Sequence, residues 1–494
     1  MATPSPTVGR ALGALLAIAA LTTGASSQER SPAPFTSDDS ALVALVLSAE
    51  ESRDLQSPAL ANAERHRNAT IQRLAARARA RIQDSTFAGR DSLVGPVRSR
   101  AAAAEPEWKA RLRAVTPARD DCAALRRAAV DPAWPVRQRA ATLARASCAA
   151  DDSLVAIFRS WVTSVPQDAS RHEAGSVSWH PAAYGVVALA RLRPAEARPH
   201  VARLARHPQW QLRQYAARAA APTGDLATLR ALTQDANENV AEAAIEWLGA
   251  TTGRADDSLY VRALSREGAQ SVRAAATALR GTTHPDAREA AWRALGRFTE
   301  RANASERDVR FALLHIAGRA VSEDRPPPRD PVLPRDAVGL ALGAERFLQV
   351  ELDEASGGGS FVVVLRGDLA PIMAARILTL AREGHYDGSS WHRVEHDFVV
   401  QGGSPDANEY VGYRQFLVDE LGTLAHPRGT VGMSTRGHDT GDAQWFVNLR
   451  DNARLRGDYT VFAEVVEGMA VVDEIVEGDR IERIREIRRI GAAR

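Results

Sequence analysis

Residues 391–403 read WHRVEHDFVVQGG, and they carry the clearest structural signal in the chain. Within them, residues 398–401 are a short, mostly apolar run that a pair of glycines ends, as a turn ends a buried strand. Similar runs of β-branched and aromatic residues lie around it, at 361–365, 430–433, 445–449 and 460–466. Glycine-rich turns separate these runs, and the rhythm predicts a closed β-barrel or a sandwich with one or two helices.

One helix is predicted within this β-rich part. Pro371 suits the first position of a helix, because its missing N–H is not needed there and its φ is already helical. Ile377, Leu378 and Leu380 then supply an apolar face. Near the end of the chain, isoleucines recur every third residue, at 481, 484, 487 and 490, and this period does not distinguish a strand from a helix.

Several motifs agree in order and spacing over about residues 346–490. They include WHRV at 391–394, FVVQGG at 398–403, GTVGMS at 429–434, QWFV at 444–447 and YTVF at 459–462. With these motifs, the C-terminal part resembles the cyclophilin family of peptidyl-prolyl cis-trans isomerases. The resemblance implies a closed antiparallel β-barrel of eight strands with capping helices, and a site on its outer surface that acts on proline-containing polypeptides.

The resemblance also implies roles for single residues. Arg393 corresponds to the catalytic arginine of the family, and Gln401 to the glutamine that positions the substrate backbone. The residues that correspond to the hydrophobic proline pocket and its rim are Phe398, Val399, Ser434, Thr435, Gln444, Phe446, Leu455 and Tyr459. Tyr459 stands where many relatives have His, so the aromatic wall is kept and activity is expected.

The chemistry of this set is clear without the family. Rotation about an X-Pro bond is slow, because amide resonance sets a barrier of roughly 18–20 kcal/mol. A guanidinium such as that of Arg393 stays protonated, and it can donate to the prolyl nitrogen when rotation localises the lone pair there. Only interactions that are stronger in the twisted state accelerate the step. We expect no metal or cofactor. His392 and His396 lie in a strand–turn context rather than on one helical face, so no metal site is expected there.

Some positions depart from the family pattern. Ser434 stands where Ala is usual, and Asp442 and Ala443 replace a common Gly-Ser before Gln444. These departures affect the expected substrate preference more than the reaction. The altered rim leaves a second interpretation open, in which the barrel binds proline-containing segments without turnover.

Residues 38–320 form a different part, rich in Ala, Leu and Arg with apolar positions at helical spacing. A pattern recurs in this part: a polar break, then a small apolar position, then an Ala-rich helix. Corresponding positions are 28 residues apart from Leu212 to Val240 and 32 residues apart from Val240 to Val272. Such periods are typical of stacked helical pairs, whose apolar faces are buried only by neighbouring pairs. This part resembles short bacterial HEAT repeats, which implies an all-α solenoid. The alternative is an irregular helical bundle.

Charge and composition limit the partners. Lys plus Arg total 63 against 61 Asp plus Glu, so a formal charge of +2 gives no general field for nucleic acid. The only lysine is Lys109, and the other basic residues are arginines. We expect the repeat arginines mainly to cover helix stems and to pair with carboxylates. A concave solenoid surface would also suit a client or partner protein, or could itself be an assembly platform.

The N-terminus has the pattern of an export signal. Arg10 precedes an apolar stretch at 11–20, and small residues follow at 25–27, so we predict a signal peptide at 1–27. The stretch is too short to predict a stable transmembrane anchor. We expect export to the periplasm of a Gram-negative-type bacterium, with secretion as the second choice. A Pro-rich linker is predicted at 321–344, before a cyclophilin-like domain at 345–494.

Cys122 and Cys148 are the only cysteines, 26 positions apart in one predicted helical region. They are either two small buried hydrophobic residues or a disulfide between neighbouring helices, which export would permit.

Overall fold

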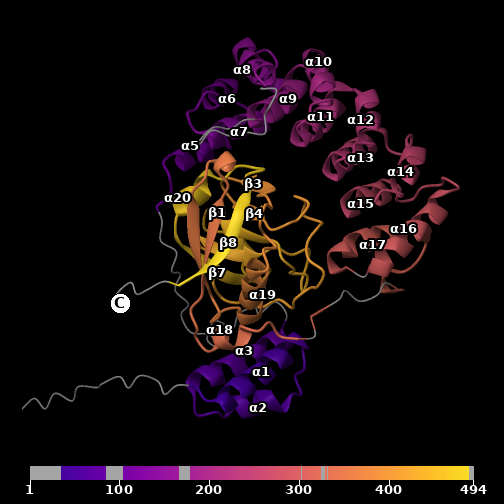
Figure 1. Cartoon of the computed structure of the whole chain (residues 1–494). Coiled ribbons are helices and arrows are strands. Elements are labelled where there is room, and N and C mark those ends of the chain that lie inside the picture. The colour runs from indigo at the N-terminus through magenta and orange to yellow at the C-terminus, as the bar shows by residue number, and fades with distance from the viewer. Residues whose placement is uncertain are drawn as a thin grey trace, which may run out of the picture. The chain divides into compact units, whose positions relative to one another are not determined.

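The computed structural model describes residues 35–84, 104–165, 179–301, 303–323, 329–330 and 332–488. In these residues a mostly helical part precedes a part built on an eight-stranded sheet, which Figure 1 draws in orange and yellow. The described residues from Ser37 onward belong to one compact unit. The predicted signal peptide at 1–27 lies outside the described residues, as does a portion of the predicted linker.

The sheet is antiparallel throughout, in the strand order β3-β4-β6-β5-β7-β2-β1-β8. Its strands are β1 (Phe347–Leu352), β2 (Ser360–Leu365), β3 (Arg393–Glu395), β4 (Val399–Gly402), β5 (Thr430–Met433), β6 (Trp445–Asn448), β7 (Val461–Glu467) and β8 (Ile481–Ile487). The five apolar runs of the sequence correspond to β2, β4, β5, β6 and β7, and the isoleucine-rich tail is a strand.

The prediction of a closed barrel is wrong, because the sheet curls but its edge strands β3 and β8 do not pair with each other. β3 has only three residues, and all three pair with β4. It therefore forms no hydrogen-bonded ladder with β8. The two edges meet instead through a few backbone bonds just before β3, among them an isolated bridge between Ser390 and Arg480. The sheet is therefore a curled half-barrel.

Helix α19 (Pro371–Arg382) is the helix predicted from Pro371, which stands in its first turn, and its apolar face is buried as expected. The backbone N–H groups of Ile372 and Met373 donate to the Glu420 carboxylate at 3.2 and 2.7 Å. The Glu420 carboxylate satisfies two N–H donors at the N-terminus of α19 that lack acceptors within the helix. It therefore fixes the loop that carries Glu420 to the start of α19. Two shorter helices, α18 (Ala337–Ala341) and α20 (Met469–Glu474), complete the sheet part.

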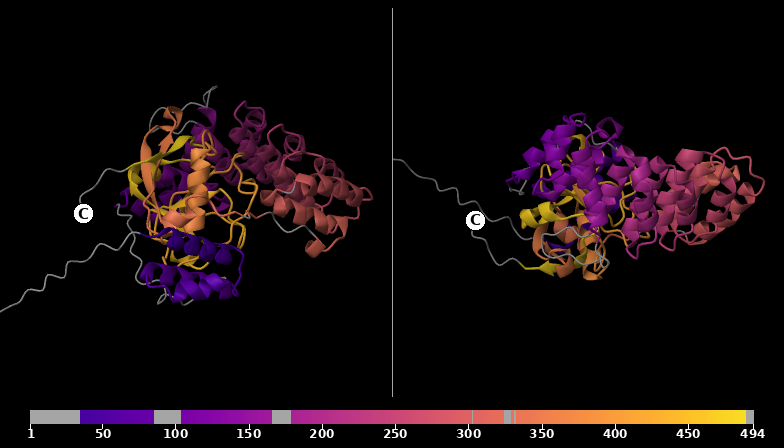
Figure 2. Two further views of the ribbon diagram at one scale, coloured as in Figure 1. Left: turned by 60° about the horizontal axis from the view of Figure 1, so that its bottom comes forward. Right: turned by 90° about the horizontal axis from the view of Figure 1, so that it is seen from above.

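The middle of the chain is a series of helices. They are α5 (Trp108–Val115), α6 (Cys122–Ala128), α7 (Trp134–Leu143), α8 (Asp152–Thr163), α9 (His180–Leu192), α10 (Pro194–Leu204), α11 (Trp210–Thr223), α12 (Leu226–Leu232), α13 (Glu238–Thr252), α14 (Asp257–Ala263), α15 (Ala269–Ala278), α16 (Ala287–Arg301) and α17 (Arg307–Ala317). Each odd-numbered helix from α7 to α17 contacts the next odd-numbered one, and we call these six the helical row. Figure 2 shows the row from two further sides. One apolar core, rich in alanine, runs from Leu112 to Ala317.

Arginines at corresponding positions bind the segments that connect successive helices. Arg137 donates from Nη1 to the carbonyls of Asp131 and Pro132, at 2.6 and 2.8 Å. Arg213 makes the same pair of bonds with the carbonyls six and five residues before it, at 2.9 and 2.8 Å. It also binds the carboxylate of Asp235, in the next break, at 2.7 and 2.9 Å. Both arginines therefore have the structural role that was expected, and Arg213 also pairs with a carboxylate.

The first three helices pack on one another, and the third binds the sheet part directly. They are α1 (Ser37–Glu51), α2 (Pro58–Glu64) and α3 (Ala69–Gln83). Arg81 of α3 is buried, and it donates to the carbonyls of Leu369, Glu420 and Leu421 at 2.8, 3.0 and 2.6 Å. It also pairs with the buried carboxylate of Glu50, at 2.7 Å. One guanidinium thus joins two segments that are about 340 positions apart in the sequence.

Cys122 and Cys148 form a disulfide, which decides between the two interpretations that the sequence left open. It ties the start of α6 to the short turn of 3-10 helix at Ala146–Cys148. In the part of the chain that the structure describes, no helix is both long enough and apolar enough to span a bilayer.

Candidate functional site

Four neighbouring strands bring the central site residues into one row. β3 places Arg393 opposite Gln401 on β4, and β4 places Gln401 opposite Phe446 on β6. β6 then places Phe446 opposite Gly432 on β5. Directly opposed residues of antiparallel strands lie on the same face of the sheet. A Cβ on Gly432 would lie 2.3 Å from Cζ of Phe446, so the glycine makes room for this ring.

The row borders a pocket of about 270 Å³. Nine of the ten residues predicted from the sequence line it: Arg393, Phe398, Val399, Gln401, Ser434, Thr435, Phe446, Leu455 and Tyr459. The tenth, Gln444, is buried and lies behind Gln401 rather than at the pocket surface. The structure therefore brings the whole predicted set together, with one member in a supporting position.

The floor of the pocket is apolar. Val399, Phe446 and Leu455 are buried against one another, and the partly buried Phe398 and Tyr459 pack on them. The rings of Phe446 and Tyr459 meet edge to face, with centroids 5.7 Å apart. This floor can take a compact apolar ring, and it offers such a ring aromatic contacts on two sides.

The rim of the pocket is polar and ordered by hydrogen bonds. Gln401 donates from Nε2 to Oγ of Ser434 at 3.0 Å and to Oε1 of Gln444 at 3.1 Å. Arg393 donates from Nη1 to Oε1 of Gln401 at 3.4 Å and pairs with Glu395 through Nη2. The Arg393 side chain is still 41% exposed, so its guanidinium is oriented but accessible.

A second layer supports the rim. Gln444 donates from Nε2 to the carbonyls of Asn408, Glu409 and Val411, at 3.2, 3.1 and 2.9 Å. The Asn408 side chain donates in turn to Oε2 of Glu242 on α13, at 2.7 Å. A continuous series of hydrogen bonds therefore connects the helical row with Gln401 at the pocket.

Two histidines lie beside the pocket region, of which His426 is fully buried. His426 stacks on the Phe446 ring, with centroids 6.1 Å apart, and its Nε2 is 3.0 Å from the carbonyl oxygen of Tyr459. Burial lowers the pKa of His426 to about 4, and burial likewise lowers the pKa of His392 to about 4. Neither histidine therefore adds a positive charge next to Arg393 at neutral pH.

Sequence reasoning missed three charged residues that line the pocket, which are Glu409, Arg436 and Arg454. Arg454 lies over the Phe398 ring, at 4.3 Å from its centroid. Arg436 donates from Nη1 to the carbonyl of Glu409 at 2.8 Å. These residues belong to loops without periodicity, so only the fold shows that they meet at the site.

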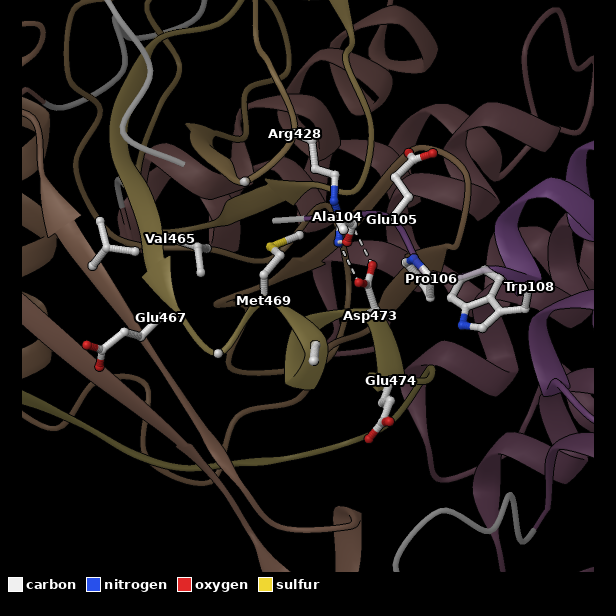
Figure 3. Close-up of a pocket in the computed structure, with 14 residues that line it drawn as sticks. Ala104, Glu105, Pro106, Trp108, Arg428, Val465, Glu467, Met469, Asp473 and Glu474 are labelled. Atoms are coloured by element: carbon white, nitrogen blue, oxygen red, sulfur yellow. Dashed lines mark hydrogen bonds and ion pairs between the residues drawn. The ribbon is translucent and has the colours of Figure 1, made fainter. Parts of the chain in front are cut away.

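A larger cavity, of about 630 Å³, lies elsewhere and shares no lining residue with this pocket. Figure 3 shows Arg428 and Asp473 pointing toward each other there, in the neighbourhood of Trp108. Arg428 and Lys109 both pair with the Asp473 carboxylate, at 2.5 and 2.9 Å. The Asp473 carboxylate thus binds two cations, and its pair with Lys109 holds α5 to the sheet part. Among the described residues no group of three His, Cys, Asp or Glu side chains could hold a metal ion.

Comparisons with known proteins show which sequences the sheet part is similar to. Residues 347–492 match the family model described as cyclophilin type peptidyl-prolyl cis-trans isomerase. A peptidyl-prolyl cis-trans isomerase of Helicobacter pylori is 38% identical over 119 residues, which cover 23% of this chain and 73% of that protein. Peptidyl-prolyl cis-trans isomerase B of Bacillus subtilis is 33% identical over 130 residues, covering 26% and 91%. A crystal structure of a cyclophilin type isomerase from Cryptosporidium parvum covers 30% of this chain and 100% of its own, with 19% identity and a TM-score of 0.28.

Proposed function

This chain belongs to the cyclophilin-type peptidyl-prolyl cis-trans isomerase family, and from that premise we propose that its pocket rotates X-Pro bonds in exported or envelope proteins and so assists their folding. The observation that carries the proposal is the position of the Arg393 guanidinium at the edge of an apolar pocket of about 270 Å³.

The pocket explains how rotation would be accelerated. The prolyl ring would rest on Phe446 and Leu455, with Tyr459 at its edge. Arg393 would then donate to the prolyl nitrogen, which becomes a better acceptor as the bond twists and the lone pair leaves resonance. Because this hydrogen bond is strongest in the twisted state, it lowers the barrier rather than only tightening binding.

The polar rim prepares Arg393 for this task. Gln401 and Glu395 each bind one side of the guanidinium, so its orientation is set before a substrate arrives. Gln401 is itself held by Ser434 and Gln444, and in this proposal it would contact the peptide backbone next to the proline. Preorganisation of this kind avoids reorientation during the reaction.

A protease-coupled isomerisation assay on the full chain tests the activity. Arg393→Ala should lower kcat/KM by about a hundredfold, the usual effect of removing one donor to the transition state. Arg483→Ala is a matched control, because Arg483 lies on β8 with 47% of its side chain exposed and an ion pair to Glu351. Peptide binding without any acceleration would instead identify a binding module.

We also propose that the helical row is a HEAT-like solenoid that holds the client polypeptide near the pocket. The successive contacts along the row and its single core support this assignment. A client held by one part of the chain presents its prolines to the other part at high effective concentration. Catalysis on an unfolded, proline-containing protein should therefore exceed catalysis on a short peptide.

Export remains part of the proposal. The Cys122–Cys148 disulfide supports it, because such bonds persist in oxidising compartments such as the periplasm. Fractionation of cells that express the chain with and without residues 1–27 tests the location. Recovery of the complete chain in the cytoplasmic fraction would contradict export.

A further inference from the structure

A second cavity, of about 400 Å³, begins where the proline pocket ends. Arg393 and Glu409 line both cavities, so the two are contiguous at the proposed reaction centre. One side of the second cavity comes from the sheet part, at residues 390, 392–393, 407–410 and 477–478. The other side comes from α11 and α13, which supply Trp210, Gln211, Gln214, Arg218, Glu242, Ala243, Glu246 and Trp247.

The helices and the sheet part are joined firmly around this cavity. Tyr184 and Tyr215 both donate to Oε2 of Glu477, at 2.9 and 2.6 Å. The Asn408 side chain donates to Oδ1 of Asn239 on α13 at 2.9 Å, in addition to its bond to Glu242. All these contacts are buried or partly buried. Hydrogen bonds therefore fix the two sides of the cavity relative to each other.

The lining of the cavity is chemically suited to a polypeptide. Trp247 is 38% exposed, although many apolar residues of the helical row are completely buried. The Glu246 side chain is half exposed and pairs with Arg273, whose guanidinium also lies 3.7 Å from the Tyr410 ring centroid. The exposed Trp247 favours an extended chain with an apolar side chain, and four lining carboxylates against two arginines disfavour an anionic ligand.

We propose that this cavity is an outer subsite of the substrate groove, in which α11 and α13 bind the client residues that flank the isomerised X-Pro bond. Trp247 provides the contact for an apolar side chain of the client. An extended chain advances about 3.3–3.6 Å per residue, so a few residues beyond the proline suffice to leave the pocket and enter the adjoining cavity. This inference rests on the proposed isomerase activity, and it makes the helical part a determinant of substrate choice.

The test compares three peptides on the full chain, with exchange spectroscopy by NMR as the readout. The first is a tetrapeptide with one X-Pro bond, and the other two extend it by four residues, including a leucine and a phenylalanine, on one side or the other. We expect one extended peptide to have a kcat/KM about fivefold to tenfold above that of the tetrapeptide, the gain typical of one aromatic anchor. Trp247→Ala should remove most of that ratio.

Trp292→Ala provides the matched control, because Trp292 on α16 has a similar exposure of 39% and does not line the cavity. It should leave the ratio of the two kcat/KM values unchanged. Trp247→Gln is the second variant, which keeps a long side chain and should lose the ratio as Trp247→Ala does. Equal kcat/KM for all three peptides, or a ratio that survives both Trp247 variants, would overturn the subsite. Absence of turnover on every peptide would instead overturn the proposed isomerase activity.

Discussion

The side-chain amide of Asn408 donates to the carboxylate of Glu242 at 2.7 Å, while the backbone carbonyl of Asn408 accepts from Gln444 at 3.2 Å. Glu242 is on α13 of the helical row, and Gln444 holds Gln401 at the pocket. A single asparagine thus connects the two parts of the chain next to the proposed reaction centre. Burial raises the pKa of Glu242, and the hydrogen bond from Asn408 opposes this shift.

Replacing Asn408 should therefore impair both folding and turnover. Asn408→Ala leaves Glu242 without one buried donor, which costs about 1–3 kcal/mol of unfolding free energy. The loop beneath Gln444 should also shift, so we expect kcat/KM to fall several-fold. Asn68→Ala is the control, since Asn68 caps α3 and its loss costs about 1 kcal/mol without touching the pocket. Equal turnover in both variants, measured alongside urea unfolding, would show that Asn408 has no positioning role.

Gly432 is expected to be intolerant of a side chain. Its added Cβ would lie 2.3 Å from Phe446, so Gly432→Ala should push the ring from the pocket floor and cost about 1–3 kcal/mol. We expect a higher KM for proline peptides and a lower thermal midpoint. Gly422→Ala is a suitable comparison, because a Cβ there meets no atom within 4 Å and the backbone is not in the left-handed region. An unchanged KM in Gly432→Ala would contradict the assigned floor.

The ion pair of Lys109 is predicted to matter for stability. Lys109 and Asp473 are 1% and 5% exposed at their side chains, and the ammonium also donates to the carbonyl of Leu449. Lys109→Met would leave Asp473 still paired with Arg428, so the loss is that of one charge-assisted hydrogen bond, about 1.5–3 kcal/mol. Arg111→Met removes the exposed pair with Asp131 and should cost less than about 1 kcal/mol. Chemical unfolding of the two variants should separate them clearly.

Asp479 should make stability fall as pH rises. Burial raises the pKa of Asp479 to about 7, so between about pH 4 and pH 7 the folded chain holds a proton that the unfolded chain releases. Unfolding free energy should then decrease through this window by at most about 1.4 kcal/mol per pH unit and level off above pH 7. Asp479→Asn keeps an acceptor for the N–H of Val476 and should remove this contribution. Parallel stability–pH curves for the native chain and Asp479→Asn would contradict the assignment.

The strands that could be predicted are those marked by a continuous run of apolar residues. β2, β5, β6 and β7 are short, nearly continuous apolar runs, and nearly all their residues are buried. β1 was missed because it alternates between half-buried and buried positions and contains Gln349 and Glu351. β3 was missed because three residues are too few to form a pattern, and its length is also the reason why the barrel does not close.

Contacts between distant segments could not be predicted in this way. The ten site residues were found because their order follows a family pattern, and nine of them line one pocket. Arg81, by contrast, looks like any helical arginine, and its three carbonyl partners lie almost 300 residues or more away. The same holds for Asn408 and Glu242, which are 166 positions apart, so the connection between the helical row and the pocket belongs to tertiary structure alone.

The burial of the single lysine has a consequence for chemical labelling. Because Lys109 is the only lysine in the 494 residues and its side chain is 1% exposed, the folded chain offers amine-reactive reagents no accessible ε-amine. Acylation of Lys109 would require α5 to leave the sheet part. The yield of acylated Lys109 would therefore report how often the contact between α5 and the sheet part opens, and no further label would have to be introduced.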